Sequence, residues 1–169
     1  LLFEENLIRK FITETKFDDI IYKAIKNHNK FTIEEGLNEE ELLQAKIIRD
    51  ADKTDIFAVY VEDINSGKNV LIDYEKVSKQ IITPKVMEDF RKHKQANRND
   101  FTCDIDLYIN VISFIFDYNY ITGLKIIHDN KYIEKTMNPI CICQDTKEQM
   151  DEIIEIANTY IKQRIEKGS

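Results

Sequence analysis

Apolar residues recur at three- and four-residue intervals along most of the chain, which is the spacing of one face of an α-helix. Helices are predicted for residues 1–12, 17–28, 38–65, from Pro84 onward, and from Asp145 to Ile165. Four Gly and two Pro in 169 residues leave few helix breakers. The sequence therefore predicts an all-α fold.

The predicted ends of these helices carry recognisable signals. Asn38 with Glu41, and Asp145 with Glu148, have the spacing of a capping box, in which side chain and backbone cap each other at a helix start. The Asn-Ser-Gly stretch at 65–67 ends the long helix.

One strongly apolar segment, LYINVISFIFDYNYITGLKII at 107–127, has two interpretations. Its β-branched and aromatic residues also suit a strand. Its length and the lack of turn residues before Gly123 favour a helix, capped by Asp104.

Composition narrows the class of protein. With 43% hydrophobic and 33% charged residues, the chain is typical of one globular domain, 1–169. A net charge of −7 argues against partners such as nucleic acid polymers or anionic membranes. No apolar run approaches the roughly 20 residues that span a bilayer. Three cysteines, an odd number without framework spacing, favour a cytoplasmic location, and Cys141 and Cys143 are interpreted as packing residues.

The stretch IIRDADKTDI at 47–56 places an acid among apolar helix positions. Residues three, four and seven apart share a helix face. The residues predicted to share the face of Asp52 are Ala45, Ile48, Ile56 and Val59. Asp52 is therefore predicted to face the core.

The other charged residues of this stretch are predicted to lie elsewhere. Asp50 should be solvated on the opposite side, Asp55 should border the apolar face, and Arg49 and Lys53 should flank its other border. An inward carboxylate needs a cation, a metal or hydrogen bonds. An internal salt bridge, for example with Arg49, and a metal site both satisfy Asp52.

His28 repeats the anomaly on the helix at 17–28. It falls on the apolar face of Phe17, Ile21, Ala24 and Ile25. A lone inward His is usually a satisfied core residue, but an imidazole and a carboxylate together suit a divalent metal. His28 and Asp52 are therefore candidate ligands of one metal site.

Several segments resemble a known family. KAIKNHN at 23–29 and LLQAKIIRDADKTDIF at 42–57 are similar to the later part of HD-domain metal-dependent phosphohydrolases. LLFEENLIRKFI at 1–12 resembles the helix after the metal-binding histidines of uncharacterised bacterial members. FIFDYNYITGLKIIHDNKYIE at 114–134 resembles their C-terminal helical region.

The resemblance implies an HD-domain-like helical bundle that hydrolyses a phosphate ester on a small substrate such as a nucleotide. Asp52 matches the late metal-binding Asp of an A-D-[KR]-x-D motif and is the expected catalytic ligand. His28 is expected to contact a second metal or the phosphate. Mn, Fe, Zn or Mg would serve as the divalent metal.

Three residues are candidate substrate contacts: Lys53, Arg49 and His93. His93 belongs to the basic Arg-Lys-His-Lys cluster at 91–94, which is either a phosphate contact or a solvated helix end.

The sequence departs from the family in its His-Asp pair, which changes the expected metal binding and activity of the chain. No His-Asp pair precedes Asp52, and His128-Asp129 follows it, in the wrong order. The chain is thus expected to be the C-terminal portion of an HD domain without the N-terminal ligand helices, to hold at most two metal ligands, and to be inactive alone. The alternative is a non-catalytic helical binding or regulatory module on an HD-like scaffold. The oligomeric state is left open.

Overall fold

The computed structural model describes residues 2–68, 70–140 and 144–168. Within these residues every regular element is a helix, which confirms the all-α fold. None of the described helices is both long and apolar enough to cross a membrane. The chain divides into two compact units, Leu1–Asp52 and Lys53–Ser169, which are treated separately below. The prediction of a single domain stays a prediction.

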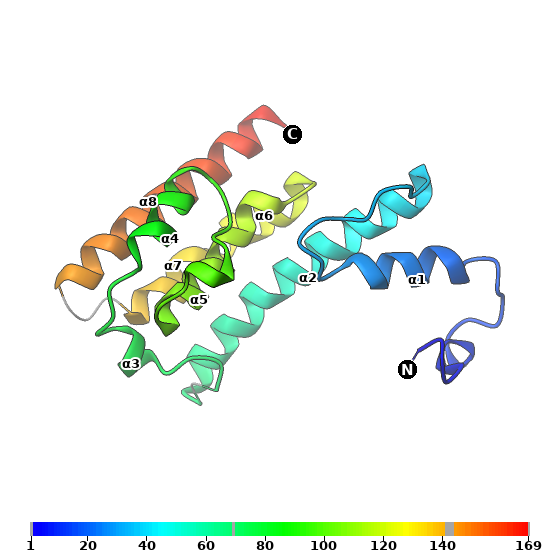
Figure 1. Cartoon of the computed structure of the whole chain (residues 1–169), viewed down its shortest axis with the longest axis horizontal. Coiled ribbons are helices and arrows are strands. Elements are labelled where there is room, and N and C mark those ends of the chain that lie inside the picture. The colour runs from blue at the N-terminus through cyan, green and yellow to red at the C-terminus, as the bar shows by residue number, and fades with distance from the viewer. Residues whose placement is uncertain (1, 69, 141–143, 169) are drawn as a thin grey trace. The chain divides into compact units, whose positions relative to one another are not determined.

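The first unit contains η1 (Leu7–Lys10), α1 (Asp18–Asn27) and the first half of α2 (Glu39–Ser66) (Figure 1). A continuous helix over 1–12 was predicted, and this was wrong. Asn6 has a left-handed backbone, with a φ of 53°, and a helix cannot continue through that conformation. Only the short 3-10 helix η1 forms after it.

The capping box at the start of α2 is confirmed. The N–H of Asn38 donates to the Glu41 carboxylate (3.0 Å), and the N–H of Glu41 donates to the Asn38 side chain (2.9 Å). Glu41 also accepts the ammonium group of Lys23 from α1 at 2.7 Å. One buried carboxylate thus fixes the start of α2 and ties it to α1.

The buried side of α2 differs from the predicted face. Apart from Asp50, the buried residues of α2 recur every four positions: Glu41, Ala45, Arg49, Lys53, Phe57 and Val61. Four residues turn a helix by about 40° more than one full turn, so this buried line winds around α2. A prediction based on one fixed face fails for such a helix.

Several predicted positions on α2 are corrected accordingly. Asp50, predicted to be solvated, is only 6% exposed. Asp52, predicted at the centre of the core face, is half-buried, and Val59 on that face is 43% exposed. Arg49 and Lys53, predicted at the border, lie on the buried line itself.

The second unit holds the remaining helices around one apolar core. They are α3 (Tyr74–Val77), α4 (Pro84–Arg91), η2 (Arg98–Asp100), α5 (Asp104–Ile112), η3 (Ser113–Asp117), α6 (Ile121–Asp129), α7 (Tyr132–Met137), η4 (Asn138–Ile140) and α8 (Gln144–Lys167). Helix α8 packs along α6 and α7, and α4 packs against α5 (Figure 1). The starts of α4 and α8 agree with the prediction, although the Asp145 side chain lies outside the described parts.

The apolar segment at 107–127 forms two helices and a 3-10 turn instead of one helix. Lys53 donates from Nζ to the backbone carbonyl of Asp117 (3.0 Å) and also contacts its carboxylate. The backbone leaves the helical conformation at Tyr118, with a ψ of 132°, and Lys53 provides a donor to the carbonyl at this helix end. The break at Asp117 is therefore stabilised by a contact 64 positions away in sequence.

Close packing follows directly after this break. The hydroxyl groups of Thr54 and Tyr118 lie 2.9 Å apart. A Cβ added at Gly123 would lie 2.2 Å from Cε1 of Tyr118 and 2.9 Å from Oγ1 of Thr54. Only glycine at position 123 lets α6 approach the Tyr118 ring this closely.

A fully buried carboxylate joins α4 to α5. Asp106 accepts the backbone N–H of Thr83 (2.9 Å), the Thr83 hydroxyl (2.6 Å) and the N–H of Thr102 (2.9 Å). Burial alone would raise the pKa of Asp106, but these hydrogen bonds outweigh it and lower the pKa below its usual value. The ionised form therefore stabilises the fold.

Replacing this carboxylate should cost stability in a pH-dependent way. Asp106→Asn is expected to lower the free energy of unfolding by about 1–3 kcal/mol at pH 7, because its NH₂ group faces hydrogen-bond donors. The pKa of Asp106 in the folded state lies below its unfolded-state value of about 3.9. The stability advantage of the wild type over Asp106→Asn is therefore complete above about pH 3.9. The advantage is lost as the pH falls through the folded pKa, and urea unfolding from pH 7 to pH 2 measures it.

The matched control is Asp104→Asn in the same helical turn. Asp104 is exposed and pairs with Lys76, so its replacement should cost less than that of Asp106. Equal losses for the two variants, or a loss at Asp106 that does not change with pH, would contradict the role assigned to Asp106.

Candidate functional site

The end of α1 is held by a buried arginine of α2. Arg49, which is 3% exposed, donates from Nη1 to the carbonyls of Asn27 (3.1 Å) and Lys30, and from Nη2 to that of Phe31 (3.3 Å). Carbonyls at and beyond a helix C-terminus lack helical partners and attract positive charge. Arg49 therefore caps α1, and its donors are used in this role.

Asn27, which the sequence analysis did not single out, fixes the same helix end. It is fully buried, donates to the Lys23 carbonyl (2.8 Å) and accepts the N–H of Glu34 (3.0 Å). Hydrogen bonds from Lys30 and then Lys26 lower the pKa of Glu34 to about 2. In the sequence, Asn27 is an amide residue at the predicted end of a helix, directly before His28, and this position could have identified it as a residue that caps the helix end.

His28 follows Asn27 and is half-buried. Its Nδ1 lies 2.5 Å from the carbonyl oxygen of Ile25. A carbonyl can only accept, so Nδ1 must carry the proton, and in the neutral ring Nε2 keeps its lone pair. Metal-binding histidines commonly have this arrangement, in which one ring nitrogen donates to a carbonyl and the other binds the metal.

Asp52 lies on α2, three residues beyond Arg49, and is half-buried. Its carboxylate makes no hydrogen bond or ion pair with any residue that the structure describes. The internal salt bridge with Arg49, which the sequence left open, is not among the contacts of Asp52 in the described residues. Asp52 is thus available to a cation from outside.

The other two candidate substrate contacts lie in the second unit. Lys53 is buried and bound to Asp117. His93 is exposed just after α4, with a φ of 56°, and its ring lies against Phe116 (5.1 Å between ring centroids) and Tyr160 (5.0 Å). A role in substrate binding for either residue stays a prediction.

The basic cluster around His93 is largely neutralised. Arg91 pairs with Glu152 (2.6 Å), and Lys92 pairs with Glu88. This arrangement agrees with the solvated helix end that was one of the two interpretations. On α6, Nδ1 of His128 and the carboxylate of Asp129 contact each other at 3.2 Å. Cys141 and Cys143 lie outside the described residues.

The metal expected from the sequence fits these side chains in type but not in number. A neutral imidazole with Nε2 available and a carboxylate without a partner suit a divalent cation. In residues 2–68, 70–140 and 144–168, however, no three His, Cys, Asp or Glu side chains gather where they could hold a metal. The described chain does not by itself form a complete metal centre.

Comparison with known proteins adds no relative. No protein-family model matches the chain, and neither a curated protein nor a solved structure matches it. The functional argument therefore depends on the residues themselves.

The state of the His28 ring can be measured directly. Two-bond ¹H–¹⁵N NMR spectra of the neutral ring are expected to show one tautomer with the proton on Nδ1. His93 serves as control, because its ring nitrogens have no hydrogen-bond partner in the described part of the chain, and it should show averaged tautomers. A proton on Nε2 of His28 would rule out the assigned arrangement.

Proposed function

We propose that this chain is part of an HD-type metal-dependent phosphohydrolase that acts on the phosphate ester of a small molecule, such as a nucleotide. The observation that carries the proposal is the half-buried Asp52 carboxylate, which has no cation partner among the described residues. It lies in the same compact unit as His28, whose Nε2 is left free for a ligand.

In this proposal Asp52 is a metal ligand, and His28 binds a second metal or the substrate phosphate. A bound divalent metal would lower the pKa of a water molecule and polarise the phosphoryl oxygen. Hydrolytic metal centres need at least three protein ligands. The 169-residue chain alone should therefore be nearly inactive, and the remaining ligands must come from other groups.

The candidate substrate contacts differ in their support. Arg49 and Lys53 use their donors in buried contacts within the protein, which supports structural roles for both. His93 is exposed and remains a candidate phosphate contact.

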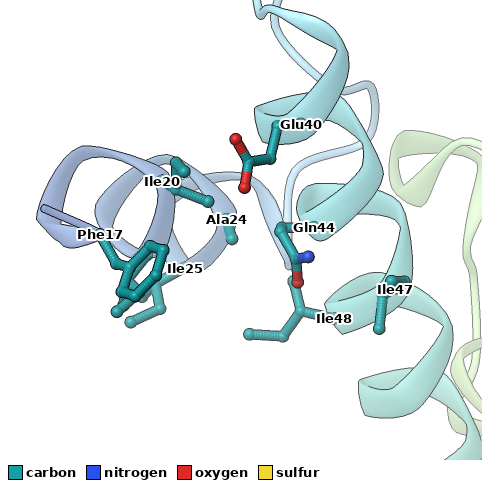
Figure 2. A pocket seen from close by; sticks show the side chains of 9 residues that line it. Phe17, Ile20, Ala24, Ile25, Glu40, Gln44, Ile47 and Ile48 are labelled. Carbon is teal, nitrogen blue, oxygen red and sulfur yellow. The ribbon is translucent and has the colours of Figure 1, made fainter. Parts of the chain in front are cut away.

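A second candidate function, a non-catalytic binding module, is favoured by one surface feature. A groove of about 410 Å³ lies between α1 and the start of α2 (Figure 2). It is lined by Phe17, Ile20, Ile21, Ala24, Ile25, Glu40, Gln44, Ile47 and Ile48. Several of these apolar side chains are well exposed, including Phe17 at 43% and Ile47 at 45%. The apolar face of a partner helix would suit such a groove.

Replacing Asp52 distinguishes the two functions. Asp52→Asn should weaken Mn²⁺ binding about tenfold or more, because it removes a charged ligand. It should change the free energy of unfolding by less than about 0.5 kcal/mol, because the carboxylate has no partner in the described structure. Electron paramagnetic resonance of free Mn²⁺ measures the binding, and urea unfolding measures the stability.

Asp55→Asn is the matched control, since Asp55 is exposed on the same helix and the substitution removes the same charge. It should leave Mn²⁺ binding unchanged. Equal Mn²⁺ binding by wild type and Asp52→Asn would refute the ligand role of Asp52. A large loss of stability without an effect on Mn²⁺ would instead support the binding module.

A further inference from the structure

We infer that Arg49 is a positioning residue that sets the place and the tautomer of His28; the inference rests on the proposed metal site. Arg49 donates to the carbonyl of Asn27, just before His28, and to those of Lys30 and Phe31, just after it. The guanidinium thus holds the backbone on both sides of the histidine.

The ring orientation depends on that backbone. His28 still has helical dihedral angles, φ −60° and ψ −40°, as the C-cap of α1. Its Nδ1 contact with the Ile25 carbonyl requires the last helical turn to stay closed. Helix ends fray readily. Without Arg49, the carbonyls after the helix end would lose a buried donor, and the turn that orients His28 would open.

Arg49 lies on the same helix as the proposed metal ligand Asp52. Arg49 and Asp52 are three residues apart on α2, within one helical turn. The clamp on α1 and the proposed metal ligand therefore belong to one rigid element. A planar guanidinium can donate to three carbonyls at once, whereas a lysine ammonium on a flexible stem cannot reproduce this geometry.

The first unit offers a matched control for mere loss of stability. Lys23 of α1 pairs with the buried Glu41 of α2 at 2.7 Å. This pair also ties α1 to α2, but it does not touch the backbone around His28. Lys23→Gln should loosen the contact between the helices and leave the end of α1 intact.

The experiment is an Mn²⁺ titration of the full ¹⁵N-labelled chain, followed by paramagnetic broadening of the His28 ring signals. Arg49→Gln should weaken the Mn²⁺ effect at His28 about tenfold, the scale seen when outer partners of metal ligands are removed. It should also turn the single His28 tautomer of the metal-free protein into a mixture. Arg49→Lys, which keeps the charge, should give an intermediate result and replaces Arg49→Gln if that variant does not fold.

Lys23→Gln should retain both the broadening and the tautomer of the wild type. Wild-type behaviour of Arg49→Gln, or an equal loss in Lys23→Gln, would overturn the inference. If Mn²⁺ broadens no His28 signal in the wild type, the proposed metal site fails instead. In that case the tautomer decides about Arg49: a single tautomer in Arg49→Gln overturns its positioning role, and a mixture supports it.

Discussion

The first unit depends on how one buried guanidinium is satisfied. A buried arginine must be fully bonded, and a carboxylate is its usual partner. Arg49 binds the carbonyls that follow α1, close to His28, and Asp50 and Asp52 follow it on its own helix. This choice closes the end of α1. It also leaves the Asp52 carboxylate without an internal cation in the described structure.

The His28 contact that matters for the proposed function depends on this closure. A helix end held by Arg49 and by the buried Asn27 keeps the Ile25 carbonyl beside Nδ1 of His28. The free ring nitrogen and the free carboxylate then lie in one compact unit. They supply two ligands of the chemical types that a divalent metal takes, and the proposed hydrolase needs further ligands to complete its centre.

Local sequence signals predicted much of the fold, and long-range contacts account for the errors. The capping pair Asn38 and Glu41 and the Thr83-Pro84 step gave correct helix starts, because these signals act within one turn. The buried line of α2 was wrong because it winds around the helix. The break at Asp117 was not predicted, and the Lys53 contact that stabilises it lies 64 positions away in sequence.

The candidate site shows the same contrast between features that local sequence predicts and features that depend on long-range contacts. His28 and Asp52 could be chosen from residue type and spacing, but the sequence placed Asp52 too deep and Asp50 too far out. The role of Arg49 was missed because every residue carries a carbonyl, and only the folded chain shows which carbonyls need a donor.

The most direct test of the central claim is anomalous diffraction from crystals of this chain soaked in Mn²⁺. The account predicts a peak in the first unit within coordination distance of the Asp52 carboxylate, with Nε2 of His28 bound to that ion or to a second ion beside it. A peak at other residues, or one bound to neither side chain, would contradict the proposed metal site.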